Sequence, residues 1–147
     1  MAKAMIVYTT RTGKTREIAN AIGEGLQASG ADIKVVDASK IRNESDLEGY
    51  DAYVFGSPTY NGEMMQGMKT LLFIAEKANL GGKVGGAFGS YGWSGEAPER
   101  IFETMRHIFS MDMVSSALRI KSPSLAISMQ QLAQAYGREI GQKKRVP

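Results

Sequence analysis

Five short segments rich in β-branched and apolar residues alternate along this chain with helical periodicities and polar turns. They span residues 5–8, 33–36, 52–55, 84–88 and 114–120. Strands that alternate with helices form a parallel sheet, because each crossover carries its helix over one face of the sheet. Right-handed crossovers then place helices on both faces. The pattern predicts a three-layer, doubly wound five-stranded α/β fold, with residues 1–147 in a single domain.

Two of the intervening helices carry clear local signals. The helix after the first strand repeats Ile18, Ile22 and Leu26 on one side. Near the C-terminus, Ser128 and Gln131 have capping-box spacing. We therefore expect a last helix that starts at Ser128 and buries the side chains of Leu132, Tyr136 and Ile140.

Composition limits the chemistry. The 147 residues are 43% hydrophobic and 22% charged, as in ordinary globular chains. No apolar run reaches membrane-spanning length and no signal-peptide pattern opens the chain, so we expect a cytoplasmic protein without membrane insertion. The absence of cysteine excludes disulfides and thiolate nucleophiles, and the single histidine, His107, argues against a histidine-rich metal site or a Ser-His-Asp triad. Redox or group-transfer chemistry would therefore depend on a bound cofactor.

The loop after the first strand combines hydroxyl side chains with a glycine directly before a helix. It reads Thr10-Arg11-Thr12-Gly13-Lys14-Thr15. The first N–H groups of a helix lack intrahelical partners and carry partial positive charge, so this loop is a candidate anion site.

Three interpretations of this loop compete. Gly13-Lys14-Thr15 matches the end of the nucleotide triphosphate motif, but Tyr8 stands where that motif requires glycine. A second interpretation is purely structural, a helix capped by Thr12 without a ligand. The third is a monophosphate site of the T-x-T-G-x-T kind. Other segments of the chain must decide among them.

The loops after the third and fourth strands have an unusual composition. Residues 57–63 and 89–95 each combine aromatic residues with glycine and small hydroxyl residues. In doubly wound sheets such loops border the ligand crevice at the carboxyl ends of the strands. Tyr60, Tyr91 and Trp93 are therefore candidate neighbours of a planar ring. The alternative is that they are partly buried loop aromatics with no ligand.

Taken together, the three loops resemble the flavodoxin family. The resemblance lies in the hydroxyl-rich first loop, in G-S-P-T-Y-N-G at 56–62 and in F-G-S-Y-G-W-S-G-E-A at 88–97. The last segment is especially similar to the flavodoxin-like domain of A-type flavoproteins, also called flavodiiron proteins. The resemblance implies strand order 2-1-3-4-5 and a non-covalent FMN cofactor.

By position in these motifs, the resemblance also implies a set of FMN-binding residues. The phosphate would be held by Thr10, Arg11, Thr12, Gly13, Lys14 and Thr15. One side of the ring would face Pro58, Thr59, Tyr60, Asn61 and Gly62. The other side would face Ser90, Tyr91, Gly92, Trp93 and Gly95, with Trp93 or Tyr91 stacked on the ring. Glu63 would accept a hydrogen bond from the ring N3–H, and the Asn61-Gly62 peptide would turn a carbonyl toward N5–H.

The favoured function is an electron-transfer protein that exchanges electrons with a protein reductase and a protein acceptor. The alternative is an FMN-dependent NAD(P)H:quinone-type reductase, which needs open space over the ring. A cofactor-free interaction domain is a third interpretation. The histidines of a diiron centre are absent, so we expect no diiron-type oxygen reduction.

The charge balance departs from the commonly acidic flavodoxins. The net charge is +3, which leaves the kind of partner open. The basic segment Lys143-Lys144-Arg145 is interpreted as a solvated end, and we expect no nucleic-acid binding.

Overall fold

A central parallel sheet organises the molecule. The computed structural model describes residues 2–92, 95–121 and 126–145. The sheet contains β1 (Lys3–Tyr8), β2 (Asp32–Asp37), β3 (Ala52–Gly56), β6 (Val84–Tyr91), β7 (Asp112–Met113) and β8 (Leu118–Lys121). Its order is β2-β1-β3-β6, with β7 and β8 both paired to β6 on the same edge, and every pair is parallel.

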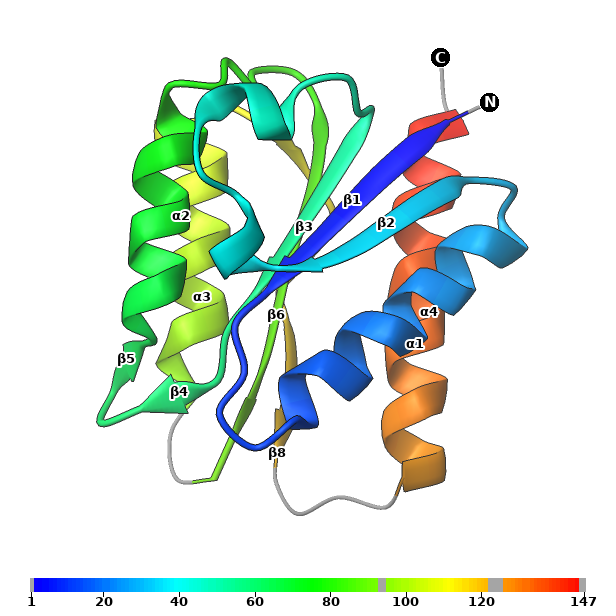
Figure 1. Cartoon of the computed structure of the whole chain (residues 1–147). Helices are drawn as coiled ribbons and strands as arrows, with labels where there is room; N and C mark the ends of the chain where they lie inside the picture. Colours follow the sequence, from blue (N-terminus) through cyan, green and yellow to red (C-terminus); the bar gives the residue numbers. More distant parts are fainter. Residues whose placement is uncertain (1, 93–94, 122–125, 146–147) are drawn as a thin grey trace.

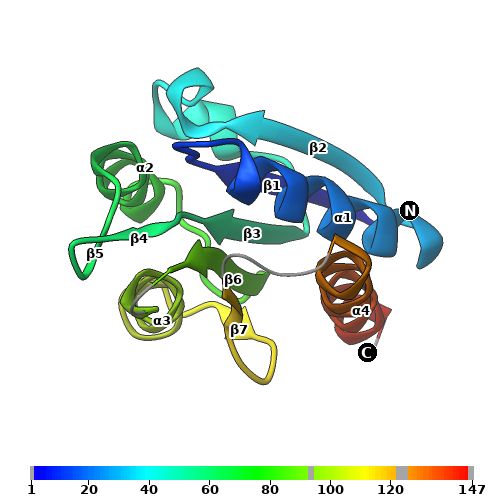
Figure 2. The ribbon, with the colours of Figure 1, turned by 90° about the horizontal axis from the view of Figure 1, so that it is seen from below.

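Four helices cover the two faces of this sheet. Helices α1 (Lys14–Ala28) and α4 (Ala126–Arg145) lie on one face, and α2 (Gln66–Glu76) and α3 (Glu96–Glu103) lie on the other (Figures 1 and 2). A π-helical turn, Thr104–Ile108, extends α3, and two 3₁₀ turns, Ala38–Lys40 and Glu44–Leu47, connect β2 to β3. The doubly wound fold and the strand order 2-1-3-4-5 are thereby confirmed, with β7 and β8 together forming the fifth strand.

The fifth strand is divided, whereas the sequence predicted one continuous run over 114–120. The backbone N–H of Ser115 donates to the Glu139 carboxylate (3.1 Å), and the Ser116 carbonyl accepts from the Tyr136 hydroxyl (2.7 Å). The Val114 N–H still donates to the Gly85 carbonyl of β6 (3.1 Å), whereas Ser115 and Ser116 bond to α4. These two bonds give the Ser115 N–H and the Ser116 carbonyl the partners that the ladder to β6 does not supply there.

The last helix also differs from its predicted form. It begins at Ala126, before Ser128, and Leu132 is 54% exposed, so the prediction that Leu132 is buried is wrong. Tyr136 and Ile140 are buried as predicted, and Met129 and Ala133 complete the buried face. Position 132 keeps the four-residue spacing with 136 and 140, but it lies at the edge of the stripe whose centre positions 129, 133, 136 and 140 form.

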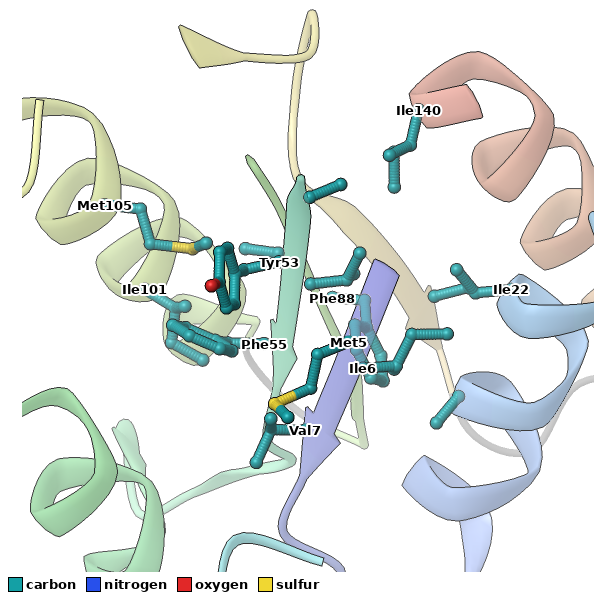
Figure 3. Close-up of a cluster of buried hydrophobic side chains, with 14 of the residues drawn as sticks. Met5, Ile6, Val7, Ile22, Tyr53, Phe55, Phe88, Ile101, Met105 and Ile140 are labelled. Carbon is teal, nitrogen blue, oxygen red and sulfur yellow. The ribbon is translucent and has the colours of Figure 1, made fainter. Parts of the chain in front are cut away.

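The core has two halves, one on each side of the sheet. Figure 3 shows Tyr53 and Phe55 facing Ile101 and Met105 on the α3 side, with Ile22 and Ile140 on the α1 and α4 side. Alternate residues of a strand point to opposite faces, so β1 and β3 contribute to both halves. Helices α1 and α4 are in close contact, since a Cβ at Gly137 would overlap the Ile22 carbonyl. Among the residues described, no helix combines the length and the apolar character needed to cross a membrane.

Candidate cofactor site at the carboxyl ends of the strands

Strands β1, β3 and β6 are neighbours, so the loops that follow them meet at one edge of the sheet, the lower end in Figure 1. Backbone bonds continue past the strand ends. The Thr9 N–H donates to the Gly56 carbonyl (3.0 Å), and the Ser57 N–H donates to the Phe88 carbonyl (3.1 Å). The three loops named from the sequence therefore start side by side.

Glycine determines how the first loop enters α1. Gly13 is the N-cap residue with φ of 92°, and its N–H donates to Thr10 Oγ1 (2.8 Å). No side chain caps the helix and Thr12 is exposed, so the interpretation of Thr12 as a cap is wrong. Among the described residues, the first N–H groups of α1 thus have no intrahelical or side-chain acceptor, as an anion site requires.

The side chains around the N-terminus of α1 also suit an anion site. Arg11 is exposed, Lys14 is partly buried and lies 3.8 Å from the Glu17 carboxylate, and Thr15 is buried. The Thr15 hydroxyl lies 3.3 Å from the Ser90 hydroxyl. This contact joins the loop after β1 to the end of β6 and places two hydroxyls together.

The second loop forms a short hairpin. Strands β4 (Thr59–Tyr60) and β5 (Glu63–Met64) pair antiparallel, and the turn residues Asn61 and Gly62 have φ of 53° and 75°. A two-residue type I′ turn requires positive φ at both central residues, and Asn-Gly is the sequence that favours this turn.

Two hydroxyls anchor this hairpin. The buried Ser57 hydroxyl accepts from the Met65 N–H and donates to the Pro58 carbonyl, both at 3.0 Å. The Thr59 hydroxyl accepts from the Ala97 N–H of α3 (2.9 Å). Pro58 and Thr59, at the base of the hairpin, are partly buried. Tyr60 and Asn61, at its tip, are exposed.

The third loop approaches the second closely. A Cβ at Gly89 would overlap the Ser57 carbonyl, so a side chain there would separate the two loops. Tyr91 is partly buried, and Gly95 lies beneath its ring, where an added Cβ would be 3.2 Å from Tyr91 Cδ1. Gly92 is exposed, and no atom of the described residues lies within 4 Å of the position of an added Cβ. Trp93 lies outside the described residues.

One contact across the loops was not expected from the sequence. The Arg11 guanidinium lies over the Tyr60 ring, 4.0 Å from its centroid, and Tyr60 is 49% exposed. A cation–π contact thus links the loop after β1 to the hairpin tip. Arg11 was assigned to the phosphate side only, and local sequence carries no signal for this pairing.

The carboxylates around the hairpin have different environments. Glu63 is exposed and pairs with Lys69 and Arg100, each at 3.4 Å. Glu96, the first residue of α3, has its Oε1 buried without a hydrogen-bond partner among the described residues, and the same is true of Thr9 Oγ1. Sequence reasoning named neither Glu96 nor Thr9, because burial is set by the packing of distant loops.

The only histidine of the sequence does not lie in any of the three loops. His107 is exposed on the π-helical turn, where its Nε2 lies 2.8 Å from the Glu103 carboxylate. Across the described parts of the chain, histidine and acidic side chains form no cluster of three that could hold a metal ion.

The donor set fits a phosphorylated planar ring. Helix N–H groups, Gly13 and the Thr10 and Thr15 hydroxyls suit a phosphate. The Tyr60 and Tyr91 rings suit an aromatic face. The unpartnered carboxylate oxygen of Glu96 suits an N–H donor, since a buried acceptor without a donor is costly.

Comparisons with known proteins agree with this geometry. The family model described as flavodoxin matches residues 6–137. The type A flavoprotein FprA of Rhodobacter capsulatus is 33% identical over 92% of this chain and 32% of its own length. A solved flavodoxin from the domain Archaea is 34% identical, with a TM-score of 0.90 over 97% of this chain and 99% of that one.

A flavodiiron protein from Giardia intestinalis shares the fold, with a TM-score of 0.87 and 23% identity over 97% of this chain and 36% of that one. This chain spans about a third or less of the curated relatives it matches.

Proposed function

Because this chain belongs to the flavodoxin family, whose cofactor is FMN, we propose that it is an electron carrier that exchanges electrons with protein redox partners. Bound FMN supplies the redox chemistry by accepting one or two electrons. The protein binds and orients the cofactor and tunes its potentials. We further propose that residues 1–147 form one domain that acts in the cytoplasm.

The convergence of three loops carries this proposal. The anion site at α1, the hairpin tip with Tyr60 and the Tyr91 segment meet at one sheet edge. The proposed phosphate ligands are the backbone N–H groups and hydroxyls of residues 10–15. The proposed ring neighbours are residues 58–62 on one side and residues 90–95 on the other, Trp93 included.

A carrier needs an exposed ring edge and no substrate pocket of its own. Tyr60 is 49% exposed and the Arg11 guanidinium lies 4.0 Å from its ring centroid, so these two side chains occupy space at the hairpin tip. A quinone or nicotinamide would need that space over the ring. This coverage favours the carrier over the NAD(P)H:quinone-type reductase.

Anaerobic reduction of the FMN-loaded protein tests the proposal. The visible spectrum should show protein-bound flavin, and stepwise reduction should resolve two one-electron potentials. Steady-state NAD(P)H oxidation with a quinone acceptor should be slow. A protein that stays colourless after incubation with FMN would exclude cofactor binding, whereas rapid quinone-dependent turnover would establish the reductase.

A further inference from the structure

An open apolar groove of about 330 Å³ lies between α2 and the π-helical turn that extends α3, on the face of the sheet opposite α1 and α4 (Figure 2). Phe73 and Ile108 line it and are 71% and 61% exposed. Leu72 and Phe109 also belong to its wall. Single exposed apolar side chains are common on protein surfaces, whereas several around one groove are typical of an interaction site.

One stripe of α2 forms the wall of this groove on the helix side. Its four residues have the spacing i, i+3, i+4 and i+7, which places side chains on one side of a helix, and they are Lys69, Leu72, Phe73 and Glu76. A different side of α2, formed by Met68, Leu71 and Ala75, is buried against the core. The helix therefore has a second, outward seam with two apolar residues between a cation and an anion.

This seam is complementary to itself. In a two-fold symmetric contact, residue i of one copy meets residue j of the other, and j meets i. If two α2 helices cross antiparallel with the axis between residues 72 and 73, Leu72 of each copy meets Phe73 of the other. Lys69 of each copy then meets Glu76 of the other. Apolar side chains thus face each other at the centre, with two ion pairs outside them.

The charges around the groove favour a second copy as its occupant. Among the described residues, Lys69 and Glu76 are the only charged side chains that line the groove. Glu76 is exposed and makes no ion pair with another described residue. Lys69 lies 3.4 Å from Glu63, but Arg100 also lies 3.4 Å from that carboxylate, so Glu63 keeps a cation when Lys69 turns to a second copy. A second copy presents the opposite charge at each position by symmetry.

We propose that this chain forms a two-fold symmetric dimer through the groove, with Phe73 of each copy inserted into the groove of the other. The proposal goes beyond the proposed function and does not depend on it. The hairpin β4–β5 runs directly into α2, so the candidate cofactor site lies toward the first residue of this helix. Antiparallel α2 helices then direct the two cofactor sites to opposite ends of the dimer, away from each other.

Sedimentation equilibrium of the full, FMN-loaded chain over a range of micromolar concentrations tests the dimer. The mass should rise from one chain to two in the native protein, whereas Phe73→Asp should stay at one chain throughout. Ile127→Asp is the matched control, because Ile127 is also 71% exposed but lies on α4 and does not line the groove. This control should associate like the native protein. A native chain that stays monomeric, with its groove open to another protein or an apolar ligand, would overturn the proposal, and so would equal loss of association in both variants.

A charge exchange tests the antiparallel register. Lys69→Glu and Glu76→Lys each place like charges opposite one another twice, so each should raise the dissociation constant of the dimer about tenfold. The double variant with both substitutions restores opposite charges in exchanged order and should associate like the native protein. Lys83→Glu, an exposed change outside the groove, controls for net charge. A double variant that associates no better than the single variants would refute the pairing of Lys69 with Glu76.

Discussion

At the scale of single residues, the site depends on backbone conformations that favour glycine. Gly13 has φ of 92°, and the nearest atom to an added Cβ is Arg16 Nη2 at 4.0 Å. Substitution there would cause dihedral strain without steric overlap. Gly49 has φ of 93° with nothing within 4 Å of an added Cβ, and it lies between β2 and β3, away from the three loops. Gly49 therefore serves as a control for Gly13, because both glycines have the same positive φ but only Gly13 lies in the candidate site.

Gly13→Ala and Gly49→Ala should each lower the free energy of unfolding by about 1 kcal/mol, because alanine in the left-handed region costs that much. Only Gly13→Ala should also weaken FMN binding, since it tilts the N–H groups that face the phosphate. Titration of FMN fluorescence measures the affinity, and urea unfolding measures the stability. The same FMN affinity in both variants would place the phosphate elsewhere.

Arg11 connects the phosphate side to the ring side of the site through its contact with Tyr60. Arg11→Gln should weaken FMN binding, because it removes a cation near the phosphate and a cation–π contact worth about 0.5–1 kcal/mol. The salt dependence of FMN affinity should become shallower as well. Arg106→Gln, an exposed change on the π-helical turn, controls for net charge. A salt dependence that is equal in both variants would remove Arg11 from the site.

Sequence reasoning could locate the loops but not these contacts. Glycine and hydroxyl residues next to a helix start are local signals, so residues 10–15 could be named in advance. The Arg11–Tyr60 contact and the unpartnered oxygen of Glu96 arise only when segments about 50 and 35 residues apart meet. No periodicity or spacing encodes which side chain of an exposed loop lies over which ring.

At the scale of elements, the fold was predictable because each strand and helix carries its own periodicity. The fifth strand was one exception, beside the start of the last helix. Its apolar residues suggested one strand, but Glu139 and Tyr136 of α4 take over the hydrogen bonds of Ser115 and Ser116. Two residues of α4 that lie 20 and 24 positions further along the chain thus decide where the strand breaks, and the sequence of the strand alone does not encode this.

Helix α4 packs against α1 through glycine, which leads to a prediction at this scale. Gly137→Ala should lower the free energy of unfolding by about 1–3 kcal/mol, because its methyl would overlap the Ile22 carbonyl and force the helices apart. The comparison change Gly23→Ala in α1 meets only the ends of side chains, the nearest being Ile33 Cδ1 at 2.7 Å, which can rotate away. Its higher helix propensity, about 1 kcal/mol, should then offset most of the crowding. Urea unfolding of both variants measures the difference, and equal losses would contradict backbone contact at Gly137.

At the scale of the whole molecule, one buried hydroxyl joins α4 to β6 and to the segment before β8, and it makes the stability of the fold depend on pH. Tyr136 lies in α4, and its hydroxyl accepts from the Ala87 N–H of β6 (3.1 Å) and donates to the Ser116 carbonyl (2.7 Å). Burial raises the pKa of Tyr136 above its ordinary value near 10. The folded protein therefore keeps the phenol proton at a pH where the unfolded chain has lost it.

The sign of the linkage follows from proton binding. Above pH 10 the unfolded state binds fewer protons than the folded state at Tyr136, so the free energy of unfolding decreases as pH rises, by up to about 1.4 kcal/mol per pH unit from this group. Below pH 10 this contribution is fully present. Burial also raises the pKa of Tyr53, which adds a decrease of the same sign.

Tyr136→Phe should separate the two effects of this hydroxyl. At pH 7 the variant should be less stable by about 1–3 kcal/mol, because the Ala87 N–H and Ser116 carbonyl lose their partner. Between pH 10 and 11 its stability should fall less steeply than that of the native protein, because phenylalanine has no proton to lose. Urea unfolding at pH 7, 9, 10 and 11 measures both quantities. Parallel stability profiles above pH 10 would mean that Tyr136 ionises as readily in the folded protein as in the unfolded chain, and that its burial between α4 and β6 is not maintained in alkali.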